Sequence, residues 1–239
     1  MDENVVAKTF VELADNGGAA SDPPALLRLL ADRCVDVLGV NAAGVLLADL
    51  SGELRVAAAS RGQVRHLELF EVLEEEGPCL DCFRRGTAVA VLDVSMEAER
   101  WPRFVPQARR RGFAAVQALP MRCRSEVVGA LNLFVADARH IEPFGSPIAQ
   151  AMADIATISL VRQRSARRSE RLTGQLQTAL DSRIVIEQAK GKLAERYGTD
   201  MERAFLSLRG YARSHNRRLS DVAREVIAGR SSPPPPEEK

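Results

Sequence analysis

The sequence predicts an α+β domain built on an antiparallel sheet, followed by a long helix and a small all-α unit of three helices. Runs of β-like residues, paired as hairpins and separated by helical segments, occupy about residues 22–140, and this mixture is typical of an antiparallel sheet flanked by helices. From Ser146 onward the apolar periodicity is helical. A length of 239 residues allows one large domain or two small ones.

The N-terminal part alternates between amphipathic helices and apolar β-like runs. Asp22-Pro23-Pro24 gives the start signal of its second helix, and Gly52 lies in the turn of its first hairpin. Residues 96–111 are expected to form a loop with a short helix. The other expected elements are helices at 3–15 and 24–38, strands at 43–49 and 54–60, a helix at 63–74, and strands at 88–93, 113–121 and 126–137.

A long helical stretch begins at Ser146. Its first part carries an apolar stripe that is expected to face the core, made of Ile148, Met152, Ile155, Ile158 and Val161. Residues 162–171 carry almost no apolar side chain and predict a solvated linking helix. Leu172, Leu176 and Ala179 then recur at a 4–3 spacing. This spacing is compatible with a short coiled coil and almost equally with a plain continuous linker helix.

The last part of the chain predicts three short helices. Gly198 can take the left-handed conformation that ends the first of them. Thr199 and Glu202 have the spacing of a capping box that would start the second helix, and Ser220 is predicted to cap the third. The Pro-rich end, residues 229–239, predicts a disordered tail. The apolar faces expected to meet in this bundle are Ile186, Ala189 and Leu193, then Met201, Ala204, Phe205, Leu208 and Ala212, and finally Val222, Ala223, Val226 and Ile227.

Charge divides the chain into two parts. Residues 1–161 hold 16 Lys/Arg and 22 Asp/Glu, whereas residues 162–230 hold 16 and 8, although the formal net charge of the whole chain is only +1. A basic block joined to an acidic one indicates that the C-terminal part meets a polyanion. A solvated basic helix surface is the alternative interpretation.

Composition and motifs disfavour several classes of protein. No apolar run approaches the roughly 18 residues needed to cross a membrane, and the N-terminus lacks the layout of a signal peptide, so a cytoplasmic protein is expected. The four cysteines suit reduced thiols better than a disulfide framework. There is no phosphate-binding glycine motif and no nucleophile pattern around the three histidines. We therefore expect no enzyme activity, and the sequence identifies neither a cofactor nor a metal site.

Cys79 and Cys82 have Cys-x-x-Cys spacing in a segment bounded by glycines. A redox role would require Cys79 at a helix N-terminus, where the dipole lowers the pKa of a thiol, and the preceding Gly77-Pro78 allows that geometry. The alternative is that both cysteines line a pocket in a loop. The pair is a weak ligand or redox candidate. A metal role would need two further ligands, taken from Cys34, Cys123 and His66.

Basic side chains of the C-terminal part recur at helical spacings. Arg183 and Lys190 are seven residues apart on the first helix, and Arg209 and Arg213 are four apart on the second, so each pair shares a helix face. Such faces neutralise several phosphates. Tyr211 offers a ring that either stacks on unpaired bases or is partly buried against the bundle. The candidate RNA-binding residues are Arg183, Lys190, Lys192, Arg209, Tyr211, Arg213, Asn216, Arg217 and Arg218.

Two known families resemble parts of the chain. The runs SRIVIEQAKGKL (182–193), AFLSLRGYA (204–212) and NRRLSDVA (216–223) resemble an ANTAR domain, the three-helix RNA-binding module of bacterial transcription antiterminators. The region at 22–160 resembles a GAF domain, a small-molecule sensory fold, through GPCLDCFRRG and the GALNLF strand at 129–134. Together they resemble a GAF–ANTAR regulator of actinobacterial type.

The resemblance implies a homodimer that binds paired hairpins in a nascent leader RNA and thereby prevents a terminator hairpin from forming. It also implies a GAF domain that binds a small-molecule ligand or serves only for dimerisation. The residues that match the family's basic surface are Lys190, Arg209, Arg213 and Arg218. The expected domains are a GAF-like sensory domain with N-terminal helices at 1–160, a linker helix or short coiled coil at 161–181, an ANTAR-like RNA-binding domain at 182–228, and the tail at 229–239.

Two other functions remain alternatives at this stage. The three C-terminal helices suit a DNA-binding helix-turn-helix, in which the N-terminal end of a recognition helix enters the major groove. The third helix, however, begins near Ser220-Asp221 and carries Glu225, and these acidic side chains are a poor surface to offer phosphate, which favours RNA. The second alternative is a cysteine-based redox sensor centred on Cys79 and Cys82.

Overall fold

The computed structural model describes residues 2–15, 22–124, 126–137 and 147–235. The chain divides into two compact units, Met1–Arg167 and Arg168–Lys239, each with its own core. One helix, α6, contributes its N-terminal part to the first unit and its C-terminal part to the second. The α+β fold with a C-terminal helical bundle is confirmed.

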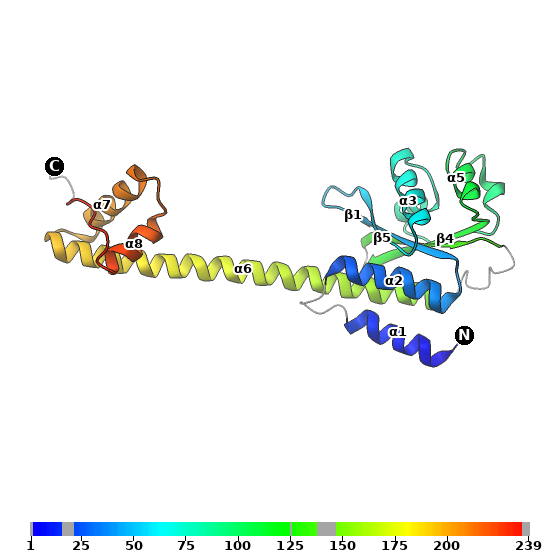
Figure 1. The fold of residues 1–239 in the computed structure, drawn as a ribbon, viewed down its shortest axis with the longest axis horizontal. Coiled ribbons are helices and arrows are strands. Elements are labelled where there is room, and N and C mark those ends of the chain that lie inside the picture. Colours follow the sequence, from blue (N-terminus) through cyan, green and yellow to red (C-terminus); the bar gives the residue numbers. More distant parts are fainter. Residues whose placement is uncertain (1, 16–21, 125, 138–146, 236–239) are drawn as a thin grey trace. The chain divides into compact units, whose positions relative to one another are not determined.

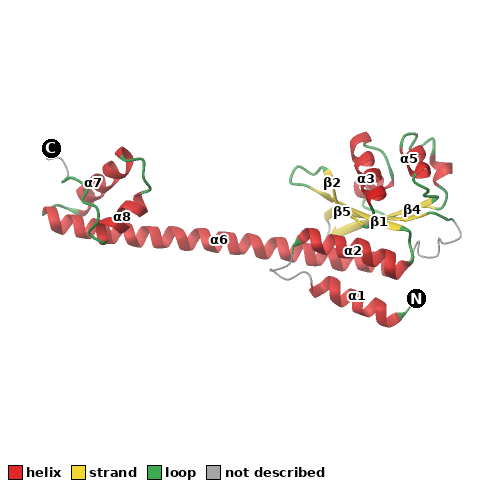
Figure 2. Ribbon diagram, viewed as in Figure 1, coloured by secondary structure: helices red, strands yellow, loops and turns green. Residues whose placement is uncertain are grey.

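An antiparallel sheet is the centre of the first unit and is drawn in yellow in Figure 2. It has five strands in the order β2-β1-β5-β4-β3. The predicted hairpins are present, and the strand predicted at 88–93 is shorter than expected. The bounds are β1 Ala42–Ala48, β2 Leu54–Ala59, β3 Val89–Val91, β4 Ala115–Cys123 and β5 Glu126–Val135. The shortest strand, β3, lies at one edge, where it pairs only with β4.

Helices cover both faces of this sheet (Figure 1). On one face, α1, α2 and the start of α6 pack against Leu131 and Leu133 of β5. On the other face, α3, α4 and α5 pack against Ala130 and Phe134 of the same strand. Alternating residues of one strand therefore serve two separate cores. The helices are α1 Glu3–Asp15, α2 Pro23–Leu38, α3 Gly62–Glu74, α4 Pro78–Arg85, the short 3₁₀ helix η1 Val94–Glu97, α5 Phe104–Arg110 and α6 Pro147–Tyr197.

The segment 77–86 is a helix, α4, rather than the loop that one interpretation of Cys79 and Cys82 required. Gly77 precedes it with φ of 140°, and Gly86 ends it in the left-handed conformation with φ of 65°. The glycines at both ends thus act as helix boundaries, as glycine commonly does. Both cysteines are buried in the core between α4 and the sheet.

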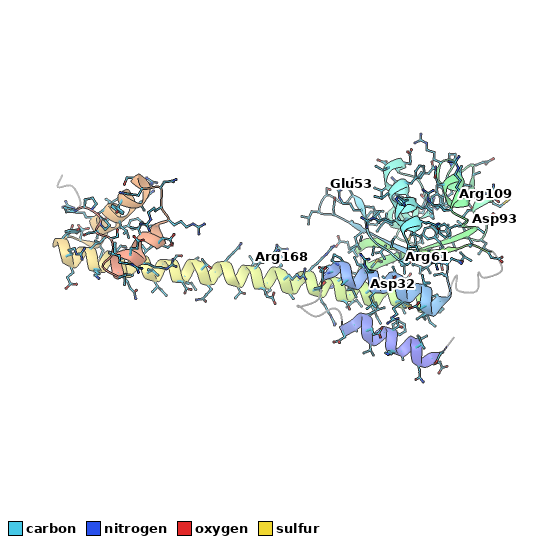
Figure 3. All side chains as sticks on the ribbon, viewed as in Figure 1. Asp32, Glu53, Arg61, Asp93, Arg109 and Arg168 are labelled. Carbon is cyan, nitrogen blue, oxygen red and sulfur yellow. The ribbon has the colours of Figure 1, made fainter. Side chains whose placement is uncertain are left out.

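The middle of α6 is exposed to solvent. Every side chain from Arg168 to Asp181 is exposed, and Figure 3 shows Arg168 projecting from the helix. The apolar stripe predicted for its first part is correct for Met152, which is buried, but wrong for Ile158, which is 44% exposed. Ser146, where helical structure was expected to begin, lies outside the described residues. No helix within the described residues is both long and apolar enough to span a membrane.

Three helices form the second unit: the end of α6, α7 Met201–Ser214 and α8 Leu219–Ile227. Their shared core contains Ala189 and Leu193 of α6, Leu208 of α7 and Val222 and Val226 of α8. Gly198 ends α6 with φ of 62°, as predicted. The two short helices, α7 and α8, are stabilised by packing on each other and on the end of α6, because short helices are marginal in isolation.

The predicted helix starts in this unit are wrong in detail. Asp200, not Thr199, caps α7, because its side chain accepts a hydrogen bond from the Arg203 amide at 2.8 Å. Met201 is 42% exposed and lies outside the core face assigned to it. Ser220 lies inside α8, which begins at Leu219 and has no side-chain cap. Ser, Thr and Asp side chains can all accept a hydrogen bond from the free backbone amides at a helix N-terminus. The sequence alone therefore does not show which of several neighbouring residues is the cap.

Part of the segment predicted as a tail, residues 229–235, contacts the second unit. Tyr197 donates a hydrogen bond from its hydroxyl to the Pro233 carbonyl at 2.6 Å, and Ser207 donates to the Pro234 carbonyl at 2.5 Å. Arg196 donates to the Ser232 hydroxyl at 2.8 Å. These contacts tie the extended segment to α6 and α7. Residues 236–239 lie outside the described part of the chain.

Candidate functional site

The clearest basic surface of the second unit runs from α6 onto one side of α7. The Lys190 ammonium lies 5.5 Å from the centroid of the Phe205 ring. Arg209 and Arg213 follow Phe205 at four-residue steps, so they continue along the same side of α7. We call Lys190, Phe205, Arg209 and Arg213 the basic flank. Both arginines are exposed, and neither forms an ion pair with another described residue.

Lys190 is the most enclosed member of the basic flank. Its side chain is only 17% exposed, and its ammonium donates hydrogen bonds of 3.0 and 2.9 Å to the Glu187 carboxylate. Its charge is therefore partly offset, and the fully exposed charges of the flank come from α7. Arg183 lies two helical turns earlier on the same side of α6 and is exposed.

Tyr211 lies on a different side of α7 from the basic flank. Two helical steps of about 100° separate it from Arg209. Its ring stacks on His215 with centroids 4.0 Å apart and an interplanar angle of 27°. The half-buried Tyr211 ring is thus held by another side chain, in agreement with the interpretation of partial burial, and not gathered with the arginines.

The turn between α7 and α8 exposes its three polar residues. Asn216 has φ of 50°, a left-handed conformation that asparagine tolerates better than most residues, so the turn geometry itself accounts for this residue. Arg217 forms a bidentate pair with Glu225 of α8, with distances of 2.8 and 2.6 Å. This pairing raises the pKa of Arg217 and lowers the pKa of Glu225. Arg218 is exposed at the start of α8.

Lys192 is half-buried and bonds to the end of another helix of the bundle. Its ammonium donates a hydrogen bond to the Ile227 carbonyl at 2.8 Å, at the C-terminal end of α8. Carbonyls at a helix end lack helical partners and attract positive charge. A structural role explains this residue, so it does not add to the exposed basic surface as expected.

A second candidate site is a buried polar cluster in the first unit, formed by Glu68, Glu71, Cys79 and Asn132. Glu68 and Glu71 of α3 have no exposed surface, although they are acidic. The Asn132 amide on β5 donates to Glu68 Oε1 and Oε2 at 3.0 and 3.1 Å and to Glu71 Oε2 at 3.3 Å. The Cys79 backbone amide donates to Glu71 Oε1 at 3.4 Å.

Small residues make room for this cluster. Gly44 on β1 is the direct cross-strand neighbour of Asn132, and a Cβ there would lie 2.1 Å from Glu68 Oε1. A Cβ on Gly77 would lie 2.1 Å from Glu71 Oε1. Each glutamate side chain therefore fills the space that a larger residue would take. The backbone at Gly44 and Gly77 thus approaches the two carboxyl groups more closely than a residue with a Cβ would allow.

Burial controls the acidity of the cluster. It raises the pKa of Glu68 to about 8, against which the hydrogen bond from Asn132 acts in the opposite direction. Burial, with the neighbouring Glu68, raises the pKa of Glu71 well above its ordinary range. The pKa of the Cys79 thiol is also raised by burial and by both glutamates.

The cysteine pair has the helix position that a redox role requires, but not the electrostatic environment. Cys79 lies in the first turn of α4, yet burial and the neighbouring glutamates raise the pKa of its thiol instead of lowering it. Burial likewise raises the pKa of Cys82 to about 12, with Arg122 acting in the opposite direction. A protonated, buried thiol is a poor nucleophile. Cys34 is buried on the opposite side of the sheet, within the core formed by α2 and α6.

Sequence reasoning missed the two glutamates and Asn132. A signal was present, since Val64, Glu68 and Glu71 recur at the i, i+4, i+7 spacing of an inward helix face. Asn132 is the single polar residue in the apolar run GALNLFV. Phe205 was assigned to the core, and the structure places it half-buried beside Lys190.

Family models identify both units. Residues 20–153, more than half of the chain, match the GAF domain model, and residues 174–227 match the ANTAR domain model. The chain belongs to the GAF family and carries an ANTAR domain. This GAF–ANTAR architecture is that of a regulator. A search among curated proteins gave no significant match.

Solved structures agree on the fold of the GAF domain. The GAF domain of a phosphoenolpyruvate-protein phosphotransferase from Coxiella burnetii is 17% identical with a TM-score of 0.52, and the alignment covers 71% of this chain and 98% of that one. A free methionine-R-sulfoxide reductase from Neisseria meningitidis is 18% identical with a TM-score of 0.51, with coverage of 68% and 89%. At these identities the likeness concerns the fold alone.

Proposed function

We propose that this GAF–ANTAR protein is a cytoplasmic transcription antitermination regulator whose ANTAR domain binds paired hairpins in a nascent leader RNA under the control of its GAF domain. The observation that carries the proposal is the contact of Lys190 with Phe205, which joins basic residues of α6 and α7 in one flank. Exposed Arg209 and Arg213 on this flank suit the phosphates of a folded RNA.

The charge of α8 supports RNA over a major-groove reader of DNA. A recognition helix presents the side chains of its first turn to base edges. Here that first turn contains Leu219, Ser220 and Asp221, all half-buried, and Arg224 is paired with Asp221 at 3.0 Å. Arg218 is exposed just before this turn, but the exposed arginines that continue the side of Lys190 and Phe205 are Arg209 and Arg213 of α7. DNA binding remains an outcome that the experiment below distinguishes.

We also propose that the protein is a homodimer that pairs through the middle of α6. Leu172, Leu176, Leu180 and Ile184 are 51–66% exposed and recur at four-residue steps on this helix. A row of exposed leucines is costly to leave in water and is suited to a second copy of the same helix. Two ANTAR domains in one dimer bind two linked hairpins, and the second binding step gains from a raised effective concentration.

Binding measurements on three nucleic acids test the proposal. Full-length protein is titrated with a two-hairpin leader RNA, one of its hairpins and duplex DNA, each over a range of salt concentrations. We expect the two-hairpin RNA to bind tightest. In the Arg209→Ala/Arg213→Ala variant we expect weaker RNA binding and a log–log salt slope smaller in magnitude by roughly 1.4, since each of the two lost phosphate contacts contributes about 0.7.

Arg203→Ala/Arg224→Ala is the matched control. Both of these arginines are exposed and belong to the ANTAR domain, but each is paired with a nearby aspartate, Asp200 or Asp221. The control removes the same charge and should keep most of the affinity. Equal affinity for the three nucleic acids, or equal losses in the two double variants, would contradict the proposal. Terminator read-through in purified transcription reactions then tests antitermination itself.

A further inference from the structure

The buried polar cluster of the GAF domain brings three potential metal ligands together. One carboxylate oxygen of Glu68, one of Glu71 and the Cys79 sulfur all lie within 4.8 Å of one another. All three residues are buried, and they come from α3 and α4 on one side of the sheet. Ligand atoms that each lie about 2.0–2.3 Å from a common ion are less than 4.8 Å apart. Small side-chain rotations would therefore bring the three atoms to one ion.

Asn132 supplies an independent sign that the cluster lacks a partner. The residue is fully buried, and no described residue donates a hydrogen bond to its Oδ1 atom. Its Nδ2 group is meanwhile surrounded by three carboxylate oxygens within 3.3 Å. A buried oxygen without a donor costs free energy. Rotation of the amide by 180° exchanges Oδ1 with Nδ2 and turns the oxygen toward the carboxylates. A cation between them would then interact favourably with the amide oxygen and with the carboxylate oxygens.

We propose that Glu68, Glu71 and Cys79, with the Asn132 side-chain oxygen, bind one divalent transition-metal ion in the core of the GAF domain. The ion displaces the protons of the Glu68 and Glu71 carboxyl groups and of the Cys79 thiol to solvent, and its two positive charges offset all but one of the three negative charges that result. The sulfur sets the class of metal, because thiol ligands favour borderline ions such as Zn²⁺ and Co²⁺, whereas Mg²⁺ and Ca²⁺ take oxygen ligands.

The backbone around the cluster fits this assignment. Gly44 and Gly77 leave the space that holds the two carboxyl groups against β1 and α4. Glu71 is held by the Cys79 amide, so one carboxylate and the sulfur are fixed to the same helix start. Cys82, one turn further along α4, does not belong to this group of potential metal ligands. The inference concerns the GAF domain alone and stands whether or not the ANTAR domain binds RNA.

Cobalt binding to the full-length protein tests the site. Protein stripped with a chelator is titrated with Co²⁺ and followed by absorption, since a cobalt–thiolate bond gives a charge-transfer band in the near ultraviolet. We expect one equivalent of Co²⁺ with this band, and its displacement by Zn²⁺. Cys79→Ser should lose the band. Glu71→Gln should weaken binding by at least about 10-fold, the loss seen even for residues that only support a metal ligand.

Two variants serve as controls. Cys82→Ser removes the other cysteine of α4, and Glu74→Gln removes an α3 carboxyl that pairs with Arg103 outside the cluster. Both should bind Co²⁺ as the wild type does. Glu71→Gln conserves volume and removes a buried acid, so the test holds even where Cys79→Ser fails to fold. The proposal is overturned by an absence of stoichiometric Co²⁺ and Zn²⁺ binding, or by a band that survives Cys79→Ser or disappears equally in Cys82→Ser.

Discussion

Lys192 of α6 and Ile227 of α8 are joined by a hydrogen bond of 2.8 Å between the lysine ammonium and the backbone carbonyl. The neighbouring Lys190, two residues earlier, instead contacts Phe205 of α7. Two lysines of one sequence motif therefore have different roles. Lys192 links the end of α8 to α6 by a hydrogen bond, and Lys190 belongs to the surface that we propose for RNA binding.

Replacement of Lys192 by methionine should loosen α8. The lost hydrogen bond involves a charged donor and is worth about 1.5 kcal/mol. We expect amide hydrogen exchange in α8, followed by mass spectrometry, to become roughly 10-fold faster. Arg183→Met is the control, because it removes an exposed charge on the same helix. It should leave exchange in α8 unchanged and weaken RNA binding; the reverse pattern would place Lys192 at the RNA instead.

Charges introduced into the exposed leucine row of α6 should dissociate the proposed dimer. In Leu176→Glu/Leu180→Glu, two carboxylates per chain would face their counterparts in the second copy. We expect a monomer by analytical ultracentrifugation and weaker binding to the two-hairpin RNA. Thr178→Glu lies on the opposite side of α6, since two helical steps separate it from Leu176 and from Leu180. This control should stay dimeric, and a wild-type protein that is already monomeric at micromolar concentration would refute the pairing.

Gly44→Ala should destabilise the GAF domain by about 2 kcal/mol, the typical cost of an added methyl in a filled core. The new Cβ would lie 2.1 Å from Glu68 Oε1 and 2.9 Å from Val64 Cγ1. Urea unfolding followed by fluorescence of Trp101, the only tryptophan of the chain, measures this change. Gly62→Ala has open space around its Cβ and should be neutral or slightly stabilising. Equal stability of the two variants would show that Glu68 does not occupy the space opposite Gly44.

The metal-free GAF domain should lose stability as pH rises. Glu68 has an ordinary pKa of 4.5 and a folded-state pKa of about 8, because burial disfavours its charged form. Between these values the folded state keeps a proton that the unfolded state releases, so the free energy of unfolding falls with pH, by up to about 1.4 kcal/mol per unit.

Below a pH of about 4.5 the contribution of Glu68 is fully present, and above about 8 it is lost. The groups that face Glu68 are Glu71 and Cys79, whose pKa values are also raised, and the neutral Asn132. Unfolding curves of the chelator-treated protein across this range measure the slope. Glu68→Gln should flatten it, whereas Glu74→Gln should not. A wild-type slope no steeper than that of Glu68→Gln would show that the carboxyl is already ionised at low pH.

The sequence was a good guide wherever periodicity decides the outcome. Helical and strand spacings predicted the elements of the sheet and most of the core face of the C-terminal bundle, because an apolar face such as that of Leu208 must be buried whatever its partner. The boundaries were less predictable. Thr199, Asp200 and Ser220 are all good helix caps, and the choice among them depends on how α7 and α8 pack. The contacts of the segment at Pro233 were not predictable, because its hydrogen bonds to α6 and α7 come from side chains distant in sequence.

The buried cluster was hidden for a different reason. Glu68 and Glu71 have the composition of a solvated helix surface, and only tertiary structure turns them toward Asn132. Burial of acidic residues goes against the general preference for solvent, so pattern reasoning passes over them. The basic residues show the same limit: spacing identified Arg209 and Arg213, but spacing alone did not separate Lys190 from Lys192.

The fit between Gly44 and Glu68 also sets a rule for how related sequences diverge. In a relative with alanine or a larger residue in place of Gly44, we expect a shorter or uncharged residue in place of Glu68, and the same holds for Gly77 with Glu71. The two positions of each pair are therefore expected to change together over evolution. Relatives that keep both glycines and both acids would be those that inherit the buried cluster, and the rest would have replaced it with an apolar interior.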